Sequence, residues 1–399
     1  MTEKINKKII VLEAIRGFLA LLVVCGHLVS KLESIRMKQN HTINFFTVWG
    51  RECVFMFFIL SGVVIHYSYI KQKRSPVLFL KQRFLRLHPT IFLAILLSAL
   101  VEIFVLDHQL TANIITGNLV PYSTMNAYLA PLLWDTNPPI WSLTFELFFY
   151  IIFALLIIRK KEINNTALLI WLLSGFVSIY YYYHPFGSPI LNHFVLMLAF
   201  SPIWIIGFYI FKYKDKLNSN FRLAIMALSL LPIVSRLHIT DNYYDPIKFV
   251  FFSLTTYPFF VFILSGNTKK PENWSTITVT IYLLVTFFTS VWIISKDETY
   301  STFVKTLYIL LPVLTSFTLR IKIIKEKLTI FLKRWFVPTF AFFGKYSYSI
   351  YLVHFPIIIL FEHTMLPLPL KIICIGLSTA LTCYVIDHQI HPRIKSLIN

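Results

Sequence analysis

The sequence predicts an all-α, polytopic membrane protein, and its composition, hydropathy and placement of charge all favour that fold class. Of the 399 residues, 57% are hydrophobic and 14% are charged, whereas a soluble domain carries about 25% charged residues. Apolar windows long enough to cross a hydrocarbon core of about 30 Å recur along the whole chain. These observations exclude an ordinary soluble enzyme.

Twelve apolar windows have the length of a membrane span, or ten if the region of windows seven to ten contains a half-span. The first window follows a basic stretch, as in a signal peptide, but it lacks a small-residue cleavage site, so we expect it to be retained. No linker or repeat divides the windows, and we therefore expect one integral-membrane domain over 1–399. The windows run over 9–30, 46–70, 87–106, 140–158, 166–183, 190–211, 221–237, 247–265, 275–295, 301–319, 337–361 and 369–389.

The net charge of +19 is explained chiefly as an orientation signal. In a polar domain such a charge would indicate a nucleic-acid partner, but the sequence offers no polar basic domain for that site, so we expect none. Most Lys and Arg residues fall in alternate connections between windows, whereas the longest predicted outer loop, Asp107 to Pro139, contains neither. The positive-inside rule then predicts that both termini face the cytoplasm.

The first window carries two ionisable residues, Arg16 and His27. Ionisable side chains are costly in a hydrocarbon core, so each is a functional candidate by default. Eleven residues separate the two, and at 100° per residue this spacing returns to nearly the same helix face, about 16 Å further along the axis. The alternative is structural, with His27 bonded to another helix and Arg16 reaching toward the membrane surface.

The second window and the start of the third contain the segments FFILSG and RFLRLHP. In the first segment, Ser61 is a candidate site residue, although a small-residue pair such as Ser61 and Gly62 more often marks close helix packing. In the second segment, Arg83 and Arg86 are three apart, which predicts one shared helix face. They either clamp phosphate groups or serve only the positive-inside rule.

The fourth window contains WSLTFELFFY. Trp141 is a candidate acceptor-site or structural residue, and it suits the aromatic belt at the membrane surface. Glu146 follows about one and a half turns deeper, which places it at a depth similar to that of His27. A carboxylate there would orient the imidazole and stabilise its protonated form, as a general base requires. The alternative is a structural partner for a buried arginine.

The eleventh window contains FGKYSYSIYLVHFP, with Tyr348, Tyr351 and His354 in its middle and outer half. Tyr351 and His354 are three apart and therefore share a helix face. This polar face is expected to reach the same layer as His27, as part of an acceptor site or as ordinary hydrogen bonding between helices.

These segments, with IRGFLALLVVCGH of the first window, resemble the acyltransferase 3 family of bacterial membrane O-acyltransferases. The resemblance implies that His27 is catalytic, that Arg16 is functional, and that Arg83 and Arg86 belong to the acyl-donor site. It also implies acetyl-CoA as the donor substrate, an envelope glycan or glycolipid such as O-antigen as the acceptor, and a location in the bacterial inner membrane.

The sequence departs from the family pattern at three places. Glu13 and Ala14 replace a common Asp-Gly pair, and Leu147 replaces a second acid after the WSL motif. The periplasmic hydrolase-like domain of many members does not follow the last window. We therefore expect the membrane domain to complete the transfer itself or to pass acyl groups to a separate protein.

The expected mechanism places the donor site and the catalytic base at different depths of the membrane. The arginines hold the polyanionic CoA at the inner side, and His27, assisted by Glu146, deprotonates an acceptor hydroxyl near the outer side. Direct attack and a transient acyl-His27 remain open, and no metal or permanently bound cofactor is expected. The rival interpretation is a transporter or flippase of an envelope precursor, whose intramembrane charges look similar, although the sequence shows no two-fold repetition.

Overall fold

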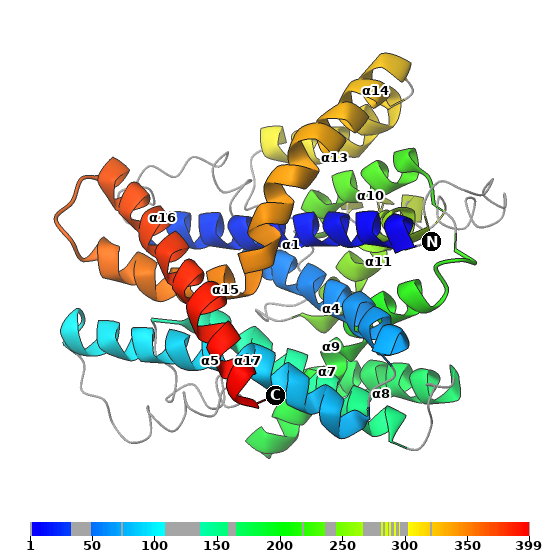
Figure 1. The fold of residues 1–399 in the computed structure, drawn as a ribbon. Helices are drawn as coiled ribbons and strands as arrows, with labels where there is room; N and C mark the ends of the chain where they lie inside the picture. Colours follow the sequence, from blue (N-terminus) through cyan, green and yellow to red (C-terminus); the bar gives the residue numbers. More distant parts are fainter. Residues whose placement is uncertain are drawn as a thin grey trace. The chain divides into compact units, whose positions relative to one another are not determined.

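A computed structural model of the chain describes residues 2–32, 49–72, 75–107, 136–158, 165–217, 219–235, 245–265, 302–319 and 321–398, together with a few positions between 281 and 295. Within these residues the protein is helical and has no β-strand. The helices (Figure 1) are α1 (Thr2–Lys31), α4 (Gly50–Gln72), α5 (Pro76–Phe104), η2 (Pro138–Ile140), α7 (Trp141–Ile157), α8 (Asn165–Tyr183), α9 (Pro189–Lys212), α10 (Phe221–Val234), α11 (Pro246–Ser265), α13 (Thr302–Thr318), α14 (Lys322–Phe331), η3 (Leu332–Phe336), α15 (Val337–Glu362), α16 (Leu368–Tyr384), η4 (Val385–Ile390) and α17 (His391–Ile398).

The described residues include eight helices that are long and apolar enough to cross a membrane. They coincide with the first six predicted windows and with the eighth and twelfth, which confirms the polytopic all-α class. The spans are Lys8–Lys31, Gly50–Gln72, Pro76–Phe104, Pro138–Ile157, Asn165–Tyr183, Leu191–Lys212, Pro246–Ser265 and Leu368–Ile394.

Three further predicted windows are helical but are not among these eight. Helix α10 has 14 residues and α13 has 17, so both are short for a full span. Helix α15 has 26 residues and carries Lys345 and His354 together with several tyrosines and serines. The window at 275–295 lies mostly outside the described residues. The membrane orientation of the termini stays a prediction.

The chain forms two compact units, and their boundaries fall inside α1, α4, α9 and α15. Whether these two units form one domain over 1–399 is not decided by this division, and the single domain stays a prediction. The first unit comprises Met1–Arg16, Val54–Lys71 and Ala199–Phe342, and the second comprises Gly17–Cys53, Gln72–Leu198 and Phe343–Asn399.

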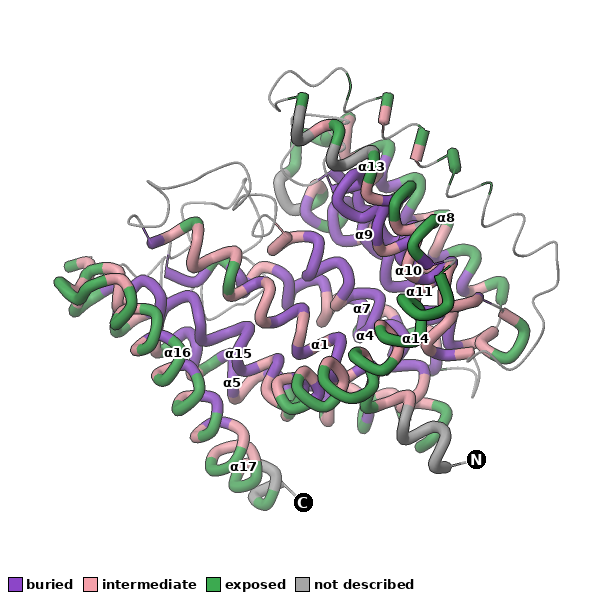
Figure 2. Tube along the Cα trace, turned by 90° about the horizontal axis from the view of Figure 1, so that it is seen from above, coloured by how far each residue is buried: buried purple, intermediate pink, exposed green. Residues whose placement is uncertain are grey.

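Large aromatic side chains form the core of the first unit. Phe55 of α4 stacks on Phe249 of α11 with ring centroids 3.7 Å apart, and on Phe200 of α9 at 5.0 Å. All three rings are fully buried. Figure 2 shows buried residues along α4 and α9, in contrast to the exposed α14.

Glycine allows α4 and α9 to touch backbone to backbone within the first unit. A Cβ atom added at Gly62 would overlap the carbonyl oxygen of Trp204, and one at Gly207 would overlap that of Ile59. Beside this contact, Ser61 accepts a hydrogen bond of 3.3 Å from the Trp204 indole. Small residues permit such close approach in membrane helices, so the structure favours the packing interpretation of the FFILSG segment.

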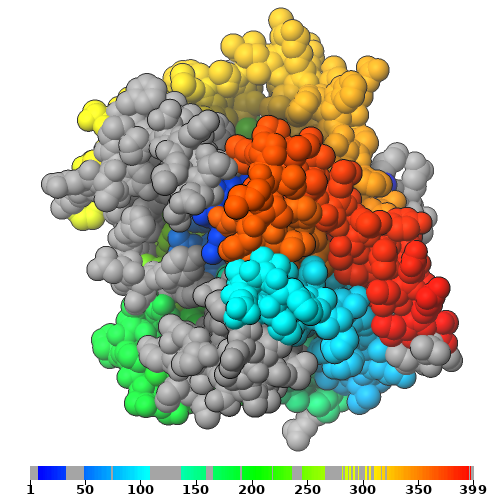
Figure 3. Space-filling model, turned by 90° about the vertical axis from the view of Figure 1, so that its left-hand side faces the viewer, coloured from blue at the N-terminus to red at the C-terminus, as the bar shows by residue number. Residues whose placement is uncertain are grey.

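The second unit packs α5 and α15 together through apolar side chains. Val101 of α5 is buried in one cluster with Phe355 and Ile359 of α15. In Figure 3 the cyan atoms of α5 lie directly against the orange atoms of α15. Other faces of this unit are apolar and exposed, as at Phe104 of α5 and Leu381 of α16. An apolar outer face is what contact with lipid requires.

Candidate active site

Two histidines meet in the second unit, one from α1 and one from α15. The Nδ1 atom of His27 lies 2.8 Å from the Nε2 atom of His354, which is hydrogen-bond distance. The two rings are nearly parallel, with centroids 5.1 Å apart and an interplanar angle of 14°. The edge-on ring of Phe355 contacts His27 at 5.0 Å between centroids. Of the predicted site residues, His27 and His354 are thus brought into direct contact.

The two histidines differ in exposure. His27 is half-buried near the carboxyl end of α1, whereas His354 is fully buried. His354 is also fixed by its own helix, because its Nδ1 atom lies 2.9 Å from the carbonyl oxygen of Ile350, one turn earlier. His27 therefore has the more accessible ring, and His354 is the anchored partner behind it.

Tyr351 shares a buried face of α15 with His354, as the spacing predicts. The two ring centroids are 6.2 Å apart. The Tyr351 hydroxyl donates a hydrogen bond of 2.9 Å to the carbonyl oxygen of Pro139, and it lies 2.9 Å from the Ser142 hydroxyl. Both partners stand at the start of α7, so Tyr351 joins α15 to that helix. The sequence analysis did not identify Ser142, although it lies in the WSL motif.

A second contact joins the same two segments. The Asn137 side-chain amide donates a hydrogen bond of 3.0 Å to the carbonyl oxygen of Leu352. Trp141, at the first turn of α7, is half-buried and packs edge-on against Phe145. The polar layer around His354 is therefore held by fixed contacts to the amino-terminal end of α7.

Glu146 has a hydrogen-bond partner on its own helix. Its carboxylate accepts a hydrogen bond from the hydroxyl of Tyr150, four residues later on α7. His27 has His354 on its Nδ1 atom. The expectation that Glu146 orients the His27 imidazole stays a prediction. The spacing of Glu146 and Tyr150, four apart on one helix, is the signal in the sequence for this contact.

The two arginines of RFLRLHP have different environments. Arg83 is buried, and its guanidinium lies 5.3 Å from the ring centre of Phe79 and 5.6 Å from that of Tyr150. Arg86 is exposed. Residues three apart on a helix differ by about 60° around the axis, and here this angle separates a buried position from an exposed one. The two arginines thus share one side of α5, as the spacing predicts, but they differ in burial.

Arg83, Tyr150 and Glu146 form one connected group between α5 and α7. Tyr150 uses its ring face for the Arg83 cation and its hydroxyl for the Glu146 carboxylate. Attraction between a cation and an aromatic face is electrostatic and strengthens when water is excluded. Tyr150 therefore positions both the buried cation and the nearby acid.

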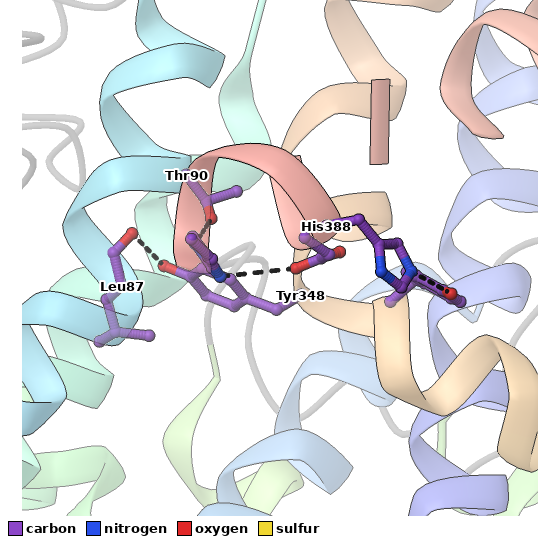
Figure 4. A network of polar contacts seen from close by, with 7 residues as sticks. Leu87, Thr90, Tyr348 and His388 are labelled. Carbon is purple, nitrogen blue, oxygen red and sulfur yellow. Dashed lines mark hydrogen bonds and ion pairs between the residues drawn. The ribbon is translucent and has the colours of Figure 1, made fainter. Parts of the chain in front are cut away.

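Polar contacts also fasten the carboxyl-terminal helices to α5 and α15 (Figure 4). The Tyr348 hydroxyl donates to the Leu87 carbonyl oxygen at 3.3 Å, and the Thr90 hydroxyl lies 2.9 Å from Nε2 of His391. His388 lies 2.8 Å from the Tyr346 hydroxyl. Tyr348 is thus a tie between α15 and α5.

Two predicted site residues belong to the first unit. Arg16 is half-buried on α1, and Ser61 belongs to the packing contact with Trp204 described above. Among the described residues, no three His, Cys, Asp or Glu side chains are placed to share a metal ion.

Comparison with known proteins agrees with this set of motifs. Residues 9–299 and 267–388 match the family described as "Acyltransferase domain". "Acyltransferase MdmB" from Streptomyces mycarofaciens is 26% identical over 147 residues, which make up 36% of this chain and 38% of that protein. The chain therefore aligns with well under two thirds of that relative. No solved structure matches the chain.

Proposed function

Because the chain belongs to the acyltransferase 3 family, we propose that it is a membrane O-acyltransferase that moves acetyl from acetyl-CoA to a hydroxyl of an envelope carbohydrate. The contact between His27 and His354 carries the proposal. It supplies a partly accessible imidazole with a fixed partner at membrane depth, and imidazole is the commonest general base in proteins. The proposed location is the bacterial inner membrane.

In the proposed reaction, His27 accepts the proton of the acceptor hydroxyl as its oxygen attacks the thioester carbonyl carbon. The bond between carbonyl carbon and sulfur breaks, and the CoA thiolate leaves and takes up the proton. The acetyl group ends as an ester on the carbohydrate oxygen. Attack through a transient acetyl-His27 yields the same products in two steps, and both routes use the same imidazole.

We assign the acyl donor to the arginines. CoA is a polyanion, and guanidinium groups bind phosphate through paired N–H groups. The exposed Arg86 suits a phosphate at the membrane surface, whereas the buried Arg83, held on the Tyr150 ring, suits a deeper part of the donor. Arg16, earlier on the same helix as His27, is proposed to contact the pantetheine portion.

The test uses the purified full chain in lipid nanodiscs with acetyl-CoA labelled in its acetyl group. An envelope glycan fraction serves as acceptor, and the label is followed into this glycan. Mild alkali should then release the label as acetate. We expect transfer by the wild-type protein and none by His27→Ala. If neither protein transfers label while the wild type moves a labelled glycolipid across a vesicle membrane, the protein is a flippase and the proposal is wrong.

A further inference from the structure

We infer that His354 is a positioning residue that fixes the proton of His27 on Nδ1 and leaves the Nε2 lone pair free to act as the base. The inference rests on the proposed function for its catalytic consequence, but the proton arrangement itself follows from the hydrogen bonds of His354. It assigns a role to a histidine that would otherwise be a buried structural residue.

The first step is the bond from His354 to its own helix. A carbonyl oxygen only accepts hydrogen bonds, so the Nδ1 atom that lies 2.9 Å from the Ile350 oxygen must carry a proton. In a neutral imidazole one nitrogen is a donor and the other an acceptor. The Nε2 atom of His354 therefore presents a lone pair.

The neutral form of His354 follows from its surroundings. The ring is fully buried, and the contacts described for it are with His27, Tyr351, Phe355 and the Ile350 backbone. None of these described contacts is with a carboxylate, and a buried charge is costly without a partner of opposite charge. An uncharged ring is consistent with such a site.

The second step places the proton of His27. Because Nε2 of His354 accepts, the Nδ1 atom of His27 at 2.8 Å must donate. The proton of a neutral His27 is then on Nδ1, and Nε2 holds the lone pair. When Nε2 takes the hydroxyl proton, the bond from Nδ1 to His354 becomes charge-assisted and therefore stronger. His354 thus orients the base and also stabilises the imidazolium.

Selective ¹⁵N labelling of histidine in the full chain in nanodiscs tests the assignment without an activity assay. The His27 signals are identified by their loss in His27→Gln. We expect a protonated Nδ1 and an unprotonated Nε2 in the wild type, and a change of this pattern in His354→Leu, which keeps much of the volume but removes the acceptor. His363→Leu is the matched control, because His363 bonds to its own helix through Nδ1 at 2.9 Å from the Ile359 oxygen but lies near the end of α15.

Kinetics of the same variants test the consequence for catalysis. General-base catalysis typically contributes at least 10²-fold, so we expect His354→Leu to lower kcat by about 10²-fold, with the KM for acetyl-CoA unchanged. His354→Gln restores an acceptor oxygen near the Nε2 position and should recover most of the loss. His363→Leu should match the wild type.

A proton on Nε2 of wild-type His27 overturns the inference, as does a wild-type kcat in His354→Leu. If the proton is on Nδ1 but the wild type transfers no acyl group, the proposed function fails while the proton assignment stands. The two failures are therefore distinguishable.

Discussion

The guanidinium of Arg83 lies 5.6 Å from the centre of the Tyr150 ring, and the hydroxyl of the same ring donates to Glu146. One tyrosine therefore supports the buried arginine of the RFLRLHP motif and the acid of the WSLTFELFFY motif. The two motifs are separate in the sequence, and within the second unit they meet at this shared side chain.

Replacing Tyr150 separates its two contacts. Tyr150→Phe keeps the ring under Arg83 and removes the hydroxyl, so the KM for acetyl-CoA should stay near the wild-type value. Tyr150→Leu removes the ring as well. A cation over an aromatic ring is worth about 1 kcal/mol, so this variant should raise the KM for acetyl-CoA roughly fivefold. Equal values of KM in the two variants would contradict the role of the ring.

Substitution by lysine should affect donor binding differently at Arg83 and at Arg86. Arg83→Ala should mainly raise the KM for acetyl-CoA, and Arg83→Lys should recover little of the loss, because lysine lacks the planar group that stacks on an aromatic face. Arg86→Lys should retain most donor binding, because at an exposed position the charge is the main requirement. Initial rates against acetyl-CoA concentration measure this. An unchanged KM in Arg83→Ala would mean that the motif serves only membrane orientation.

His27→Ala should abolish transfer while the protein still inserts in the membrane. The side chain is half-buried, so its loss should leave a folded protein. Transfer of labelled acetyl measures the first effect, and membrane extraction with a single size-exclusion peak measures the second. Full activity in a correctly inserted His27→Ala protein would rule out the proposed mechanism.

The crossing of α4 and α9 predicts a large effect from one methyl group. Gly62→Ala should destabilise the first unit by about 1–3 kcal/mol, because its Cβ would meet the backbone of Trp204. Gly376→Ala on α16 is the control, because a Cβ there meets no atom within 4 Å. Thermal unfolding in nanodiscs compares the two variants. Similar unfolding temperatures for both would contradict the close packing.

The sequence by itself determined the class of the protein and most of its spans. Lipid offers no hydrogen bonds, so a chain that crosses it must satisfy its backbone groups internally, and long continuous apolar windows predict that helices do this. The direction in which each span crosses the membrane also indicated how deep each residue lies. For this reason His27 and His354 could be expected in one layer before their contact was seen.

The tertiary structure decided which side chains meet within that layer. Depth suggested Glu146 as a partner of His27, and only the structure shows that His27 contacts His354 and that Glu146 accepts a hydrogen bond from Tyr150. Spacing placed Arg83 and Arg86 on one side of α5, but it did not decide that Arg83 is buried and Arg86 is exposed. The physical reason is that periodicity fixes the angles within one helix, whereas the rotation of each helix against its neighbours depends on the packing of all of them.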